Sequence, residues 1–196
     1  MKKQAWMTMT VIAATLIAGA AQAAAGDNLV RGRIISVQPA SSSSPVVGVS
    51  VANQATLEVD VTHFLTNNIA LELIAATTKH DVSLNNSKLG TVGVLPPTLT
   101  AQYHFAPDAT FRPYVGAGLN YTRFYSVNLG TGLDVGKNSF GGALQIGADY
   151  QINKDLFINV DVKKIFMKTD VTANGAYLTT LKIDPIVIGL GVGMKF

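Results

Sequence analysis

The sequence predicts an all-β protein: an eight-stranded antiparallel transmembrane β-barrel with four long extracellular loops and three short periplasmic turns. Three observations point to this fold: stretches in which polar and apolar residues alternate, connections that are alternately long and short, and a low content of charge. Charged residues make up 14% of the 196 residues and hydrophobic residues 48%, whereas about a quarter of an ordinary soluble domain is charged. We therefore expect much of the surface to face something other than water.

The overall composition excludes several classes of function. The chain has no cysteine, which rules out a disulfide scaffold, a thiolate metal site and a cysteine nucleophile. Without Lys2 and Lys3, the 15 basic residues fall to 13, against 12 acidic residues. A net charge this close to zero gives no reason to expect a nucleic acid partner.

The N-terminus has the pattern of an export signal. Lys2 and Lys3 precede an uncharged stretch with an apolar centre at Val11–Ala18, and Ala21-Gln22-Ala23 supplies a small-x-small cleavage pattern. A permanent membrane helix is the alternative, but the strongly apolar part is shorter than the ~20 residues that span a bilayer. We therefore expect a cleaved signal peptide at 1–23 and an outer-membrane β-barrel domain at 24–196.

Alternation with a period of two marks the strands. In Gln54–His63 the polar residues Thr56, Glu58, Asp60 and Thr62 share one face, and Leu57, Val59 and Val61 share the other. Eight stretches show this pattern, namely Leu29–Val37, Gln54–His63, Ile69–Ala75, Thr98–Phe105, Arg112–Tyr125, Leu144–Tyr150, Leu156–Lys163 and Ile186–Phe196. One apolar face and one polar face per strand fit a barrel whose outside contacts lipid.

The connections between these strands alternate in length. Short turns lie at Thr66–Asn68, Ala106–Ala109 and Asn153–Asp155, and long loops at 38–53, 79–94, 126–138 and 167–180. This asymmetry is typical of outer-membrane barrels, with the long loops outside the cell. The run Ser41–Pro45 is interpreted as a mobile loop. Four loop lysines, Lys79, Lys88, Lys137 and Lys168, are either solvated or in contact with lipopolysaccharide phosphates.

A soluble barrel of the lipocalin type also alternates, but its outer face carries charge. Here the wholly apolar face carries aromatic residues near the strand ends, which fits the girdles of a membrane barrel. These aromatic residues are Phe64, Tyr103, Phe105, Tyr121, Tyr150 and Phe196. The terminal Phe196 also fits the signal by which the barrel assembly machinery recognises its substrates.

The polar face, assigned to the lumen, predicts a charged floor at the periplasmic end. Arg31 and Arg33 lie low on the first strand, opposite the glycines of the last strand, which leave space for two guanidinium groups. The expected charge plug consists of Arg31, Arg33, Glu58, Asp60, Glu72 and Asp149, with Asp161 near the middle. We expect these opposite charges to pack together.

Higher in the lumen the inward positions become apolar. They are Ile35, Val37, Ile74, Phe124, Ile165, Ile183 and Val187, together with Ala76. An eight-stranded barrel holds side chains or one small ligand and is no general aqueous pore. We interpret these residues as a site for an apolar molecule that enters from outside and leaves sideways into the membrane. The alternative is a packed, structural barrel.

Catalysis and metal binding are weakly supported. His63 and His104 lie near the periplasmic end, and His80-Asp81, with Ser83 and Ser87 nearby, lies in a loop. Adjacent residues of a strand point to opposite faces, so His80 and Asp81 make a poor catalytic pair. We therefore expect no enzyme activity, no metal site and no cofactor.

Four stretches resemble the OmpW family of outer-membrane proteins, which includes alkane-uptake relatives. They are Thr66–Leu73, Leu95–Phe105, Arg112–Tyr121 and Lys182–Pro185. The resemblance implies a narrow hydrophobic channel for small apolar solutes with a lateral opening in the wall. It also implies links to stress responses and use as a receptor by bacteriocins or phage, so a structural or stress-related envelope barrel serving as a receptor or adhesin stays an alternative.

The chain departs from the family in two places. It ends Met194-Lys195-Phe196, where the family commonly has an aromatic residue before the basic one. The expected mature chain has no tryptophan, which leaves any gating aromatic to phenylalanine or tyrosine.

Overall fold

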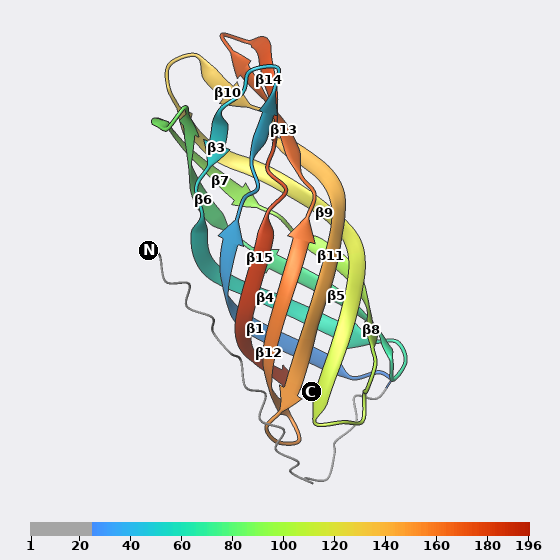
Figure 1. Ribbon diagram of the computed structural model, residues 1–196. Coiled ribbons are helices and arrows are strands. Elements are labelled where there is room, and N and C mark those ends of the chain that lie inside the picture. Colours follow the sequence, from blue (N-terminus) through green and yellow to red (C-terminus); the bar gives the residue numbers. More distant parts are fainter. Residues whose placement is uncertain (1–24) are drawn as a thin grey trace, which may run out of the picture.

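The computed structural model describes residues 25–196, and they form a closed antiparallel barrel (Figure 1). The expected signal peptide lies outside the described residues. Each barrel strand pairs with the next along the chain, and the last pairs with the first, Leu29 opposite Lys195. The eight barrel strands are β1 (Asn28–Gln38), β4 (Gln54–Phe64), β5 (Ile69–Ala76), β8 (Thr98–His104), β9 (Phe111–Leu129), β11 (Asn138–Gln151), β12 (Leu156–Ile165) and β15 (Ile186–Lys195). This is the predicted fold class, and strand number and order are confirmed.

The alternation in the sequence becomes an inside and an outside. Along β4, buried and exposed residues alternate from Leu57 to Phe64, with Glu58, Asp60 and Thr62 inside. The outside is a continuous apolar band in which Leu57 is 70% exposed and Ile34 67% exposed. A soluble surface rarely exposes apolar area on this scale, whereas a barrel in lipid requires it. No helix of the described residues is long and apolar enough to cross a bilayer.

The four long connections contain β-structure of their own. Their strands are β2 (Ser42–Ser44), β3 (Val49–Val51), β6 (Thr78–Leu84), β7 (Ser87–Leu95), β10 (Leu133–Val135), β13 (Lys168–Ala173) and β14 (Ala176–Lys182). In Figure 1 they extend the barrel beyond the ends of the spanning strands. On one side β3, β6 and β7 continue the main sheet beside the upper part of β9, and on the other β10, β13, β14 and β2 form a second sheet.

Two expectations are corrected here. The run Ser41–Pro45, expected as a mobile loop, contributes β2, which pairs with β14. Phe64 is not an outward girdle residue: it is 3% exposed and its ring lies 4.9 Å from that of His104. Phe64 is two residues beyond Thr62 on the same strand and therefore shares its inward face. The other five predicted girdle residues are 40% to 68% exposed and point outward.

Candidate functional site

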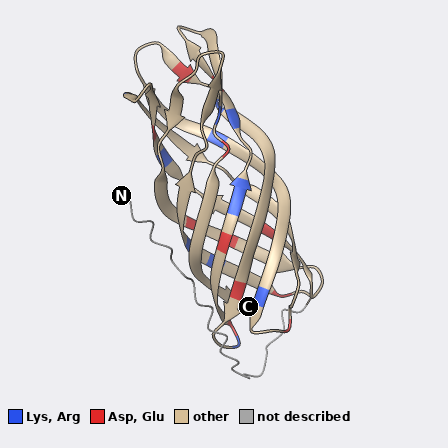
Figure 2. Ribbon diagram, viewed as in Figure 1, with Lys and Arg blue, Asp and Glu red and all other residues tan. Residues whose placement is uncertain are grey.

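The lumen is divided into layers along its length. At the periplasmic end Leu29, Phe64, Ala70 and Phe157 form a small buried apolar cluster. Next comes a layer of buried charges, seen in Figure 2 as blue and red segments on neighbouring barrel strands. Beyond it lies a larger apolar cluster that continues into the extracellular extension. The lumen is thus closed toward the periplasm by packed side chains and becomes apolar toward the outside.

Arg31 stands at the centre of the charged layer. Its Nη1 lies 2.9 Å from Asp60 Oδ1 and 3.2 Å from Glu72 Oε1, and its Nη2 lies 3.0 Å from Asp149 Oδ2. The guanidinium also lies 5.6 Å from the centre of the Tyr114 ring. Burying a charge is costly unless it is paired, and three carboxylates supply that pairing here.

Arg33 and Lys163 complete the layer one step higher. Arg33 Nη2 lies 2.6 Å from Asp60 Oδ2, and its Nη1 lies 3.1 Å from Asp161 Oδ2. Lys163 Nζ bridges Glu58 Oε1, at 2.6 Å, and Asp161 Oδ2, at 3.0 Å. All of these side chains are at most 4% exposed. The network links β1, β4, β11 and β12 across the lumen through buried ion pairs.

Glycines of β15 make room for this network. Arg33 faces Gly191 across the β1–β15 ladder, and Arg31 faces Gly193. A Cβ atom on Gly191 would lie 2.6 Å from Arg33 Cγ and 2.1 Å from the carbonyl oxygen of Gly32. Glycine is therefore required at Gly191 by the close approach of the β1 backbone and of the Arg33 side chain.

Above the charges lies a lower cavity of about 40 Å³. Glu58, Lys163 and Thr98 form its base, so the cavity rests directly on the charged layer. Its remaining lining is mostly apolar and includes Ile35, Val37, Ile74, Ala76, Ile165, Ile183 and Val187.

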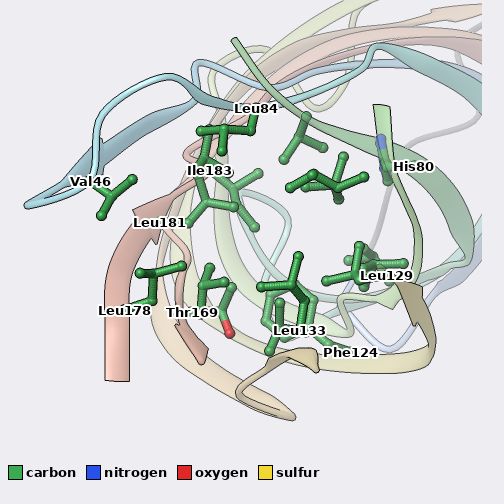
Figure 3. A pocket seen from close by; sticks show the side chains of 18 residues that line it. Val46, His80, Leu84, Phe124, Leu129, Leu133, Thr169, Leu178, Leu181 and Ile183 are labelled. Carbon is green, nitrogen blue, oxygen red and sulfur yellow. The ribbon is translucent and has the colours of Figure 1, made fainter. Parts of the chain in front are cut away.

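An upper cavity of about 80 Å³ lies inside the extension (Figure 3). Of the 18 residues that line it, His80 and Thr169 are polar and the others are apolar. Figure 3 shows Phe124, Leu129, Leu133, Leu181 and Ile183 pointing into the same space. Both cavities are smaller than the ~150 Å³ apolar cavity that holds benzene in an engineered protein, so a solute that passes requires side chains to shift.

The two cavities share the residues Val51, His80, Val94 and Ile183, which form the neck between them. His80 lies on β6 in the extension, with Nδ1 2.8 Å from the Ala52 carbonyl oxygen and Nε2 2.7 Å from Thr78 Oγ1. Burial lowers the pKa of His80 below its ordinary value, against a smaller opposite effect of the bond to Ala52. The neck is therefore uncharged at neutral pH.

The wall beside the lower cavity is thin at Met167. This residue lies between β12 and β13 and lines the lower cavity and also a pocket of about 170 Å³ on the outer wall. The β12–β15 ladder ends at Lys164 opposite Ile186, and the β13–β14 ladder begins at Lys168 opposite Lys182. Between them the Met167 N–H donates to Asp184 Oδ1 at 2.9 Å instead of to a regular ladder partner.

Comparison with known proteins identifies the fold and its setting. The sequence model of the OmpW family matches residues 24–196. Outer membrane protein W of Vibrio cholerae is 35% identical over 99% of this chain and 100% of its own length. The chain belongs to the OmpW family. The structures of OprG from Pseudomonas aeruginosa and of AlkL in lipid bilayers superpose with TM-scores of 0.78 and 0.70.

These two solved structures cover 88% and 97% of this chain, and 97% of their own chains in each case, at 28% and 25% identity. The relatives are outer-membrane proteins, and this OmpW-family barrel accordingly spans the bacterial outer membrane. The lipid-facing band and the extension beyond it follow from that location.

The structure places the predicted site residues in two groups. The six residues expected as a charge plug all lie in the buried charged layer, which Asp161 and Lys163 extend. Six of the seven residues expected as the apolar site line the lower cavity, namely Ile35, Val37, Ile74, Ile165, Ile183 and Val187. Phe124 lines the upper cavity instead, where Ile183 also reaches.

Sequence reasoning missed the apolar residues of the extension. Val82 on β6, Val92 and Val94 on β7, and Val171 on β13 line the upper cavity, yet they fall in stretches expected to be loops. The signal was present, because His80, Val82 and Leu84 alternate with Lys79, Asp81 and Ser83.

The histidines are far apart in the structure. His63 is exposed beside Asn28, His104 is buried near the periplasmic end, and His80 lies in the neck. Asp81 points away from His80 and pairs with Lys88 at the surface, so the two neighbours do face opposite ways. Within residues 25–196, no three histidine, aspartate or glutamate side chains are placed to hold a metal ion.

Proposed function

We propose that this OmpW-family barrel conducts small apolar molecules from outside the cell into the outer membrane. The solute enters the upper cavity, passes the neck at His80 and reaches the lower cavity. The charged layer blocks further movement toward the periplasm, so the solute leaves sideways. The observation that carries this proposal is the apolar lumen of two stacked cavities above a buried layer of ion-paired side chains.

The exit we propose lies at Met167. Its side chain separates the lower cavity from the outer-wall pocket, where Phe140 and Phe166 are 69% and 42% exposed. Side-chain hydrogen bonds replace part of the backbone ladder here. Besides the bond to Asp184, the Lys168 N–H donates to Ser139 Oγ at 3.0 Å, while the Met167 carbonyl oxygen still accepts the Ile183 N–H at 2.9 Å. A methionine is flexible and adapts its shape, which suits a plug that moves as a solute passes.

The test is uptake of a labelled small hydrocarbon by cells with and without the protein, together with the Met167→Ala and Met167→Trp variants. We expect faster uptake with the protein than without it. Met167→Ala should increase uptake further because it widens the passage, and Met167→Trp should make uptake slower than in the original protein because it fills the passage. Met194→Ala is the control, since Met194 is 57% exposed on the outer face of β15. Uptake equal with and without the protein would favour the structural or receptor barrel, whereas unchanged uptake in both Met167 variants would place the exit elsewhere.

A further inference from the structure

The outer-wall pocket combines two cations with two exposed aromatic rings. Phe140 and Gly141 of β11 line one side, and Phe166, Lys168, Lys182 and Asp184 complete the lining with Met167. We propose that this pocket binds lipopolysaccharide of the outer leaflet, with a lipid phosphate held between Lys168 and Lys182 and an acyl chain against Phe140 and Phe166. This binding does not depend on solute transport.

The two lysines are direct cross-strand partners. Lys168 at the start of β13 stands opposite Lys182 at the end of β14, and both are exposed on the outer face. Like charges placed directly opposite each other destabilise a β-ladder. An anion bound between the two lysines offsets this repulsion, because both ammonium groups then donate charge-assisted hydrogen bonds to it.

The nearby carboxylates do not neutralise this pair. Asp184 Oδ1 accepts the Met167 N–H, and Asp170 Oδ1, two register positions further along the ladder, accepts the Thr180 hydroxyl at 2.6 Å. Among residues 25–196, neither Lys168 nor Lys182 lies within ion-pair distance of a carboxylate. Lys164 adds a third positive charge, with Nζ donating to the Asp184 carbonyl oxygen. The pocket therefore keeps an excess of positive charge.

The position of the pocket selects a lipid over a free anion. Phe166 follows directly after Ile165, the last residue of the spanning strand β12, so the pocket lies where the apolar band meets the extension. Aromatic rings at this level pack against the outer ends of acyl chains. The outer leaflet of this membrane consists of lipopolysaccharide, whose lipid A carries phosphates on its sugar head directly above the acyl chains.

Native mass spectrometry of the purified full barrel tests the proposal, with bisphosphorylated lipid A as the probe. Each lysine close to a membrane surface contributes about fivefold to binding of an anionic lipid, so Lys168→Gln with Lys182→Gln should weaken binding about 30-fold. The control is Lys79→Gln with Lys154→Gln, which removes the same charge from the extension and from a periplasmic turn and should change binding by less than about twofold. Retained resistance of the barrel to SDS at room temperature shows that each variant is folded.

Two further arms separate the sources of the anion. Dephosphorylated lipid A with the same acyl chains should bind weakly to the original protein. Its affinity should be about that of phosphorylated lipid A for the double lysine variant. Phe140→Ala with Phe166→Ala should weaken lipid A binding while both lysines remain. Equal loss in the control and lysine variants, equal binding of the two lipids, or full competition by millimolar inorganic phosphate would each overturn the proposal.

Discussion

At the scale of single residues, the space between Gly191 and Arg33 is tightly constrained. A Cβ at Gly191 would contact Arg33 Cγ at 2.6 Å and the Gly32 carbonyl oxygen at 2.1 Å, and neither strand can move without disturbing the charged layer. We expect Gly191→Ala to lower the free energy of unfolding by about 2 kcal/mol, the middle of the range for overpacking a filled interior. Denaturant unfolding of the refolded barrel in lipid measures this change.

Gly32→Ala is the matched control. Gly32 neighbours Arg33 on β1 but faces outward, and a Cβ there meets nothing within 4 Å. Its free energy of unfolding should change by less than about 0.5 kcal/mol, since surface substitutions away from special features are nearly neutral. A similar loss in both variants would show that the close approach of β1 at Gly32 and Arg33 does not set the requirement for glycine.

His80 gives a pH dependence at the same scale. Burial lowers its pKa in the folded protein, so below its ordinary pKa the unfolded chain takes up the proton first. The stability contributed by neutral His80 is fully present at neutral pH. It is lost as the pH falls through the ordinary pKa of histidine toward the lower pKa of His80 in the folded protein. The free energy of unfolding should therefore decrease more between pH 7.5 and pH 5.5 for the original protein than for the His80→Gln variant. If the stability of His80→Gln depended on pH as strongly as that of the original protein, His80 would not be the source of this pH dependence.

At the scale of elements, the strands that cross the membrane were predicted from the sequence, and the strands of the extension were missed. The polar and apolar faces of β4 and β12 differ sharply because one contacts buried charge and the other lipid. In the extension the contrast is weaker, since β13 alternates Thr169 and Val171 inside with Lys168 and Asp170 outside. The turn signal was nonetheless strong: Asn174-Gly175 joins β13 and β14 with φ of 49° and 80°, the pattern of a tight hairpin.

The Asn174-Gly175 turn provides a test at this scale. A Cβ at Gly175 meets nothing within 4 Å, so a substitution acts through the positive φ alone. Gly175→Val should cost about 1–2 kcal/mol and raise hydrogen exchange in β13 and β14 roughly tenfold. Gly175→Asn should have a much smaller effect, because asparagine tolerates this conformation. The barrel should keep its resistance to SDS, since β13 and β14 belong to the second sheet; its loss would show that the two sheets unfold together.

At the scale of the whole molecule, the sequence predicted that the lumen is divided into a charged layer and an apolar layer. It did not predict the neck between the two cavities or the wall at Met167. Alternation identifies which residues face inward, and strand order fixes their depth, so Arg31 and Ile35 fall in the correct layers. The neck at His80 and the thin wall at Met167 depend on how the extension folds back over the barrel. Those contacts join residues such as Val51 and Ile183 that are distant in sequence, and no local pattern encodes them.

The separation into a charged floor and an apolar chamber makes one prediction for the complete barrel. Arg33→Gln removes a cation that lies against Glu58, Asp60, Glu72 and Asp161, so these carboxylates repel one another and water enters the layer. Breaking a buried pair in this way costs about 3–5 kcal/mol. The lower cavity shares Glu58 and Lys163 with the floor, but its apolar lining and Met167 lie above the floor and stay in place. We therefore expect ion leakage in planar bilayers to rise strongly while hydrocarbon uptake changes by less than about twofold.

Arg123→Gln is the control for this experiment, because Arg123 lies on the outer face and donates to Asn138 at 2.9 Å. It should alter neither ion leakage nor uptake. If Arg33→Gln reduced uptake as much as it altered leakage, the floor and the chamber would not be separate parts. The solute would then have to pass through the charged layer, and exit through the wall at Met167 would be wrong. Leakage that rises alone places the barrier to ions in the floor and the path of the solute above it.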